Sequence, residues 1–435
     1  MKSWQKILGI VLVIVAVGAL AVNHFSKGDG TSTKTKDGKT KITMAWWGAQ
    51  TRHDATVKVI KMYEKLHPKI DIDYEFYDFD GYFTKMNTLQ ASKTVWDVFQ
   101  MGNNYQTYLS SIQPLNKYIK DGTIDVSDTS EQYLKTTKYN KDQLGISNGA
   151  GAYAIAYDPS IFKKAGIPEP TSDWTWDEFE DIALKIHKKL GIYGFSNFDD
   201  FIAGATVGVG QYGKGQEFFD KASDSKKLGF KNAKLLVPYL EMRKKLVDAG
   251  AYPDTGAIAE IKDIEGDYLV TGKAAMTWIA ANQITSVTNA SKRQIKMVTL
   301  PKREKDVPAV SVSSAQMMCI AKNSKVKKEA AKFISWFEND LKANKILNAE
   351  RGVPIMTKVR NELSTKADPT TKQLIDYVDL VGEIGNKNAN NVESPYNNEI
   401  KDHYILLLQQ VVAGEMKPDK AATELYKFAK EKTQE

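Results

Sequence analysis

Three short stretches of the chain bring together aromatic rings and planar hydrogen-bonding groups. They read WWGAQTR at 46–52, YDFDGY at 77–82 and GNNYQ at 102–106. None of them pairs an obvious nucleophile with a general base, so this set of side chains fits binding better than catalysis. The candidate ligand-binding residues in these stretches are Trp46, Trp47, Gln50, Asp80, Asn103 and Asn104.

Strands and helices alternate around these stretches. Apolar or alternating runs at 42–47, 70–76 and 96–101 predict strands, and apolar residues at helical spacing in 52–66 and 82–89 predict helices between them. This β-α-β-α-β order implies parallel strands with right-handed crossovers, which places the chain in the α/β class. The ligand crevice of such a sheet lies beyond the carboxyl ends of its strands. We therefore expect the three stretches to meet at one edge of the sheet.

Length and composition narrow the class of protein. At 435 residues the chain is too long for one ordinary core, so we expect two lobes. The formal charge is +7, but residues 1–40 hold six Lys and two Asp and so supply +4 of it, which argues against a nucleic-acid partner. The single cysteine, Cys319, excludes an internal disulfide. The five scattered histidines predict no metal site, and we expect no cofactor.

The N-terminus has the pattern of a segment that directs export. Lys2 and Lys6 precede the apolar run ILGIVLVIVAVGALAV, and Ala19 and Ala21 provide small residues for cleavage. The run is slightly shorter than the roughly 20 residues of a spanning helix, so a signal peptide and a retained anchor both stay open for residues 1–25. Residues 26–41 are polar and predict a flexible tether. We expect an extracellular protein, secreted or tethered to the outer face of the membrane.

Six fragments follow one another along the rest of the chain in an informative order. They are ITMAWWGAQTRHDATVKVIKMYEKLHP from 42, YAIAYDPSIFKKAGIPEPTSDWTWDEF from 153, GKAAMTW from 272, LP at 300, KKEAAKFISWF from 327 and ERGVPI from 350. In this order and spacing the chain resembles the extracellular solute-binding proteins of ABC importers, family 1, which includes oligosaccharide binders such as maltose-binding protein. Relatives from Gram-positive bacteria usually carry a lipobox cysteine after the signal. Its absence here excludes covalent lipid anchoring.

The resemblance implies a two-lobe, periplasmic-binding-protein-like α/β fold. Each lobe would be a mostly parallel sheet flanked by helices, and several hinge crossings would join the lobes. Lobe one would comprise 41–150 plus 276–315, and lobe two 151–275 plus 316–435. The joints would fall near GAGAY at 149–153, near Trp278 and near VSSAQ at 312–316. The further ligand-binding residues that the resemblance implies are Tyr153, Trp278, Arg351 and Tyr396.

On this basis we expect a non-enzymatic protein that captures a carbohydrate of the oligosaccharide class in the cleft between the lobes. The lobes would close on this ligand about the hinge. The protein would deliver this ligand to the permease subunits of an ABC transporter and act as a monomer. A flat ring matches the C–H face of a sugar, and amides and carboxylates match its hydroxyls. Adjacent residues of a strand point to opposite faces, so we expect one of Trp46 and Trp47 to belong to the core.

Two alternatives remain open. A secreted glycoside hydrolase would need two carboxylates across the cleft, and Asp80 and Glu350 are the candidates, although nothing in the sequence pairs them. The same fold could instead bind another solute, such as a peptide, a polyamine or an anion. Individual residues also have structural interpretations, because Asp80 and Asn104 suit turns and Arg351 suits a hinge ion pair.

Overall fold

The computed structural model describes residues 33–48, 50–261, 263–303, 307–387, 389 and 393–434. The predicted signal or anchor segment at 1–25 lies outside the described residues, as does the start of the predicted tether. Within the described residues, no helix is both long enough and apolar enough to cross a membrane. The end of the predicted tether is not a loose linker, because Lys34 forms an antiparallel bridge with Thr40, the first residue of a strand.

The first lobe begins with the predicted alternation of strands and helices. Its elements are β1 (Thr40–Trp47), α2 (Gln50–Leu66), β2 (Ile70–Tyr77), α3 (Phe79–Ser92) and β3 (Val98–Met101). Strand β1 pairs in parallel with β2 on one side and β3 on the other, so the carboxyl ends of all three lie at one edge. The β-α-β-α-β prediction is therefore confirmed.

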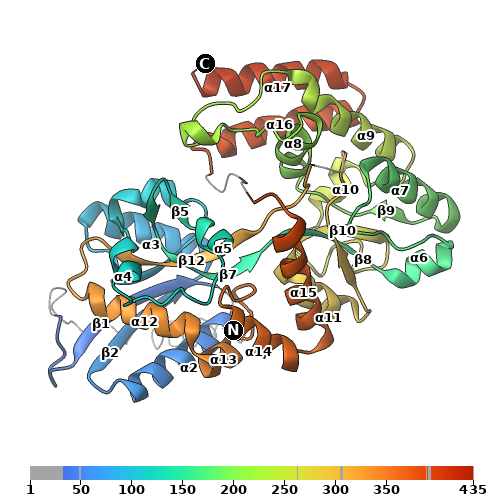
Figure 1. Ribbon diagram of the computed structural model, residues 1–435. Helices are drawn as coiled ribbons and strands as arrows, with labels where there is room; N and C mark the ends of the chain where they lie inside the picture. The colour runs from blue at the N-terminus through green and yellow to red at the C-terminus, as the bar shows by residue number, and fades with distance from the viewer. Residues whose placement is uncertain are drawn as a thin grey trace, which may run out of the picture.

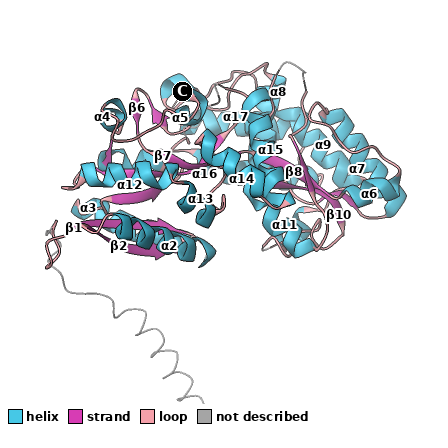
Figure 2. Ribbon diagram, turned by 60° about the horizontal axis from the view of Figure 1, so that its bottom comes forward, coloured by secondary structure: helices cyan, strands magenta, loops and turns pink. Residues whose placement is uncertain are grey.

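The rest of the first sheet is antiparallel and comes from distant parts of the chain. Strand β12 (Ser313–Ala321) pairs antiparallel with β3, with β4 (Ile112–Gln113) and with β7 (Ile146–Gly151). Helices α12 (Lys327–Asn339) and α13 (Leu341–Leu347) pack on this lobe against β12 and α2. Helices α2 and α12 share one face of this sheet, because Tyr63 of α2 packs on Phe333 and Trp336 of α12. Figure 2 shows both helices beside the strands of this lobe.

The second lobe has its own sheet of four strands (Figure 1). Its order is β11 (Lys296–Val298), β8 (Tyr153–Tyr157), β10 (Ala274–Ala280) and β9 (Tyr193–Phe195). Strand β8 is antiparallel to both of its neighbours, and β10 is parallel to β9. Both sheets are thus mixed rather than mostly parallel as predicted, because β12 is antiparallel to its partners in the first sheet and β8 is antiparallel to its neighbours in the second.

Helices cover the second sheet and extend beyond it. Helix α7 begins with a capping box between Thr175 and Glu178. Helices α16 and α17 pack together and against α9, and Figure 1 shows them at one end of the lobe. The helices of this lobe are α6 (Pro159–Ala165), α7 (Trp176–Leu190), α8 (Gly208–Tyr212), α9 (Val237–Asp248), α10 (Thr255–Ala259), α11 (Ile284–Ser291), α15 (Pro369–Ile384), α16 (Asn397–Val412) and α17 (Pro418–Lys432).

The predicted division into lobes is wrong after residue 275. Residues 276–315 were assigned to lobe one, yet β10 and β11 pair with β8 in the second sheet. Trp278 therefore lies inside a strand of lobe two and not at a joint. Conversely, β12, α12 and α13 belong to lobe one, although 316–435 was assigned to lobe two. Local patterns identify strands but not their partners, which is why this boundary was misplaced.

The chain crosses between the sheets near two of the predicted joints. At GAGAY, β7 ends at Gly151 in the first sheet and β8 begins at Tyr153 in the second. Gly149 is needed there, because a Cβ at this position would lie 2.5 Å from the Arg351 carbonyl oxygen. The second crossing leads from β11 to β12, into VSSAQ. A third joins α14 (Thr357–Lys366), which packs on α13, to α15.

Candidate functional site

A cavity of about 330 Å³ lies between the two lobes. Asn103 reaches it from the loop after β3, and Ser313 reaches it at the start of β12. Tyr153, at the start of β8, lines it from lobe two. The other lining residues are Phe201, Ile202, Thr206, Val207, Leu300, Ala309, Val310, Ser311, Glu393, Asn397 and Lys401. The cleft implied by the two-lobe fold thus contains residues from both lobes.

The two adjacent tryptophans of β1 have different environments. Trp46 is fully buried, and its Nε1 donates to Nδ1 of His53 at 3.1 Å. Its ring cannot reach a ligand here, so its predicted ligand role is wrong. Trp47 points to the other face and is half-buried, with its ring centroid 5.0 Å from that of Tyr82. It also lies against Gly102, where a Cβ would be 3.8 Å from the indole, beside Asn103.

The other candidates from lobe one differ in how they relate to the cavity. Asn104 precedes a 3₁₀ turn and makes no side-chain cap bond there. Gln50 is exposed at the start of α2, where its Nε2 donates to Asp54 Oδ1 at 2.7 Å, and Asp80 is exposed in the first turn of α3. Neither of these two lines the cavities between the lobes. Only the third loop therefore reaches the interlobe cavity as the strand-end argument predicted.

Tyr153 and Trp278 form an aromatic pair on lobe two. Ala280 of β10 pairs with Tyr153 of β8, and Trp278, two residues before Ala280, lies on the same face of β10. The Tyr153 and Trp278 ring centroids are therefore only 4.8 Å apart. Tyr153 is 40 % exposed toward the cleft. Desolvation between the lobes nevertheless raises the pKa of its phenol to about 12, and the carboxylates of Asp199 and Glu393 raise it as well. Trp278 lines a neighbouring cavity of about 460 Å³ that shares Lys401 with the first.

Charged residues of lobe two that sequence reasoning missed also line these cavities. Asp199 precedes a π-helical turn (Phe201–Val207), where its Oδ1 accepts from the Ile202 amide. Its Oδ2 accepts from Lys401 Nζ at 3.0 Å, and Lys401 follows Asn397 by four residues, on the same face of α16. No local signal in the sequence marks these residues as neighbours.

A buried ion pair fixes this wall. Arg243 is fully buried, and its Nε donates to Asp200 Oδ1 at 2.8 Å. Its guanidinium lies 3.5 Å from the ring centroid of Tyr252, and the Tyr239 hydroxyl donates to the same Asp200 oxygen at 2.6 Å. Burial alone would lower the pKa of Arg243, but the charge of Asp200 keeps it above the usual value. Asp200 directly precedes the π-helical turn and makes no side-chain cap bond there, so this network positions the turn and its neighbour Asp199 by holding the Asp200 side chain.

Arg351 and Tyr396 lie outside the linings of the interlobe cavities. Arg351 is 2 % exposed, and its three guanidinium nitrogens find no hydrogen-bond partner among the described residues. Burial lowers its pKa to about 9, and burial raises the pKa of nearby Glu338 to about 8. Arg351 thus lies buried next to Gly149 at the hinge crossing and does not face the cleft. Tyr396 is half-buried and packs on the core of α16 and α17.

The carboxylates considered for hydrolysis are not brought together around a cavity. Glu350 Oε2 accepts from Arg52 Nε at 2.7 Å, and Arg52 also bonds Gln316 Oε1 at 2.7 Å. An ion pair near the hinge was considered for Arg351, but it is formed by the neighbouring Glu350 with Arg52. Asp80 lies exposed on α3.

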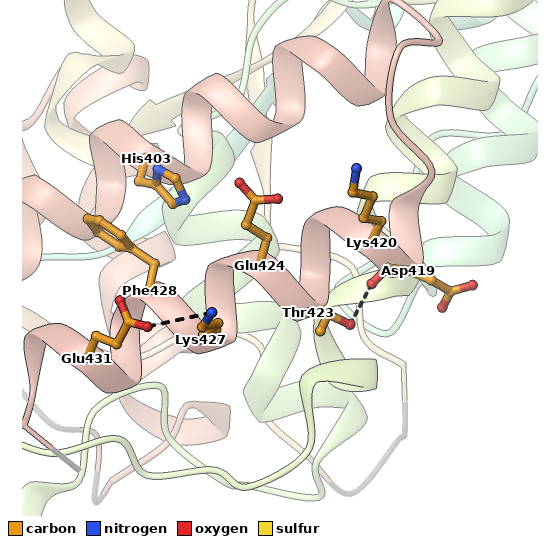
Figure 3. A pocket seen from close by; sticks show the side chains of 8 residues that line it. All are labelled: His403, Asp419, Lys420, Thr423, Glu424, Lys427, Phe428 and Glu431. Carbon is orange, nitrogen blue, oxygen red and sulfur yellow. Dashed lines mark hydrogen bonds and ion pairs between the residues drawn. The ribbon is translucent and has the colours of Figure 1, made fainter.

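A larger hollow of about 730 Å³ lies away from the hinge, between α16 and α17 (Figure 3). His403 stacks on Phe428 there, with ring centroids 4.1 Å apart, and side chains of both charges surround them. None of the predicted ligand-binding residues lines it. Within the described residues, no group of three or more His, Cys, Asp or Glu could hold a metal ion.

Comparison with known proteins identifies the family. Residues 35–340 match the family model of bacterial extracellular solute-binding proteins, so the chain belongs to this family of binding proteins. A protein of Brucella abortus described as a binding protein is 28 % identical over 163 residues, which is 36 % of this chain and 38 % of that protein. The alignment thus spans less than half of that relative.

Solved structures extend the likeness of fold over most of the chain. An oligogalacturonide-binding protein of Yersinia enterocolitica, in complex with saturated digalacturonic acid, is 22 % identical with a TM-score of 0.74. The match covers 91 % of this chain and 98 % of that one. An ABC substrate-binding protein of Listeria monocytogenes, in complex with cycloalternan, is 21 % identical with a TM-score of 0.72, covering 91 % and 99 %. The two-lobe α/β fold is thereby confirmed.

Proposed function

We propose that this protein captures an oligosaccharide in the cavity between its lobes and delivers it to the permease of an ABC transporter. The observation that carries this proposal is the mixed lining of that cavity. Asn103 comes from lobe one, whereas Tyr153, Asn397 and Lys401 come from lobe two. Relatives with the same fold, named for oligogalacturonide binding or solved with cycloalternan, support the choice of carbohydrate.

The lining suits the alternating surface of a sugar. The Tyr153 and Trp278 rings offer flat apolar surface for C–H groups on lobe two, and Trp47 offers it beside Asn103 on lobe one. Asn103, Asn397 and the Tyr153 hydroxyl can exchange hydrogen bonds with sugar hydroxyls. The cavity that Trp278 lines adjoins the one that Tyr153 lines, which gives room for more than one sugar unit.

Binding would proceed by hinge closure. An oligosaccharide held by one lobe gains contacts with the other only when the lobes approach, so it shifts the population toward the closed form. A contact across the lobes already exists outside the cavity, where the Tyr139 hydroxyl donates to Asp224 Oδ2 at 2.8 Å. We propose that the closed form, as a monomer outside the cytoplasm, is what the permease recognises.

The test is a thermal-shift panel on residues 27–435 with neutral and acidic mono- and oligosaccharides, peptides and polyamines, followed by product analysis of each mixture. A ligand at 100 times its dissociation constant stabilises the folded state by about 2.7 kcal/mol. We expect a rise in melting temperature with oligosaccharides, which are recovered intact. Shortened products would identify a hydrolase, and a response to peptides or polyamines alone would overturn the carbohydrate assignment.

A further inference from the structure

Glu393 occupies the boundary between two cavities. It lines the cavity between the lobes and also an adjoining one of about 550 Å³ that extends along 214–219. Asn397 Nδ2 donates to Glu393 Oε1 at 3.2 Å, which holds the carboxylate over the start of α16. Among the described residues, no hydrogen-bond donor pairs with Glu393 Oε2. This oxygen is therefore available to a ligand.

The charges around Glu393 do not cancel. The ammonium group of Lys401 is bonded to Asp199 Oδ2, so one of the two carboxylates has a direct partner and the other has an amide only. Asp199, Glu393 and Lys401 together carry a net charge of −1. Burial raises the pKa of Glu393, while the Asn397 bond and the charge of Lys401 lower it. The Glu393 carboxylate thus gives the cavity wall a negatively charged hydrogen-bond acceptor that is partly shielded from water.

Such a wall distinguishes between two classes of sugar. A carboxylate only accepts hydrogen bonds, and it bonds hydroxyl groups more strongly than an amide does. A uronic acid would instead bring a second carboxylate toward it, and like charges repel strongly where water is excluded. The relative that holds digalacturonic acid shows that this fold can bind such a sugar, so the choice depends on the lining residues.

We propose that Glu393 is a specificity-determining residue that makes the cleft select neutral oligosaccharides over those built from uronic acids. This inference rests on the proposed function. Glu393 accepts from one or two sugar hydroxyls through Oε2 and excludes a ligand carboxylate from the same position. Lys401 offsets this repulsion only in part, because Asp199 already balances its positive charge.

The test compares two sugars by calorimetric titration. One is the neutral oligosaccharide with the largest thermal shift in the panel, and the other is saturated digalacturonic acid. We expect the wild-type protein to prefer the neutral sugar by at least about tenfold. Glu393→Gln keeps the shape and removes the charge. It should weaken binding of the neutral sugar about threefold and strengthen binding of the acidic one about threefold.

The matched control is Glu399→Gln, which removes the same charge from the first turn of α16. Glu399 is exposed and pairs with Lys432 on α17, so its loss should leave the ratio of the two affinities unchanged. Melting temperatures without sugar check that both variants fold. Equal or tighter wild-type binding of digalacturonic acid overturns the inference but leaves the proposed function standing. An unchanged ratio in Glu393→Gln overturns it too. A protein that binds no sugar at all overturns the proposed function, and the inference with it.

Discussion

The two halves of the cleft are built in different ways. The half on lobe one presents neutral groups, Asn103 from the loop after β3 and Ser313 at the start of β12, and the half-buried Trp47 lies beside Asn103 without lining the cavity. The half on lobe two is charged and comes from distant segments of the chain, among them Asp199, Glu393 and Lys401. A neutral loop needs only the sheet to position it. The charged side chains of lobe two come from separate segments that must be held together, and the buried ion pair of Arg243 and Asp200 holds the segment that carries Asp199.

The largest expected effect follows from breaking that support. Replacing Arg243 with Met leaves Asp200 buried beside Tyr239 without its charge partner, so we expect a loss of about 3–5 kcal/mol in the free energy of unfolding. Urea denaturation measures it. Lys244→Met on the same helix removes a solvent-accessible pair with Asp248 and should cost less than about 1 kcal/mol. Equal losses in the two variants would show that the buried pair does not anchor lobe two.

A buried charge on lobe one is expected to act in the opposite direction. Burial raises the pKa of Glu338 from 4.5 to about 8, against the charge of Arg351. Between these values the folded state keeps a proton that the unfolded state releases, so stability should fall as the pH rises from 4.5 to about 8. Glu338→Gln should remove most of this dependence, whose slope is at most about 1.4 kcal/mol per unit of pH. Thermal unfolding across this range measures it, with Glu329→Gln on the same helix retaining the slope as the control.

The aromatic residues of the two halves should contribute unequally to binding. Trp278→Ala removes a ring that pairs with Tyr153, and we expect about 2 kcal/mol of lost sugar affinity, or roughly thirtyfold. Trp47→Ala should cost about 1 kcal/mol, because part of that ring already packs on Tyr82 and Phe83. Calorimetry measures both. Trp46→Phe is the control on the buried face of β1, and a loss of affinity there would contradict the assignment of faces.

A similarly small effect should come from the contact that joins the halves. Tyr139→Phe removes the hydroxyl that donates to Asp224, and we expect sugar affinity to fall by about 1 kcal/mol, or roughly fivefold, because the closed arrangement loses support. The same change at Tyr118, on lobe one, should have no effect on affinity. Tighter binding by Tyr139→Phe would mean that the contact holds the lobes in an arrangement that opposes the ligand.

The same contrast explains what the sequence could predict. Strand and helix periods are local, so the parallel core of lobe one and the loop with Asn103 followed from the residues themselves. The face of a strand end is not local, so the sequence predicted that one of Trp46 and Trp47 belongs to the core but not that it is Trp46, which packs on Tyr74 and Phe76. The partner of a strand is less local still, and β10 was placed in the wrong lobe. Asp199 and Glu393 were missed because 193 residues separate them in the sequence, and no local pattern relates the two positions.

The most direct test of a ligand held by both lobes is the footprint of the bound oligosaccharide in amide hydrogen exchange. Saturation with the sugar should slow exchange in the loop at 102–105 on lobe one and in 197–207 and 393–401 on lobe two. Protection confined to a single lobe, or to the groove between α16 and α17, would contradict the account.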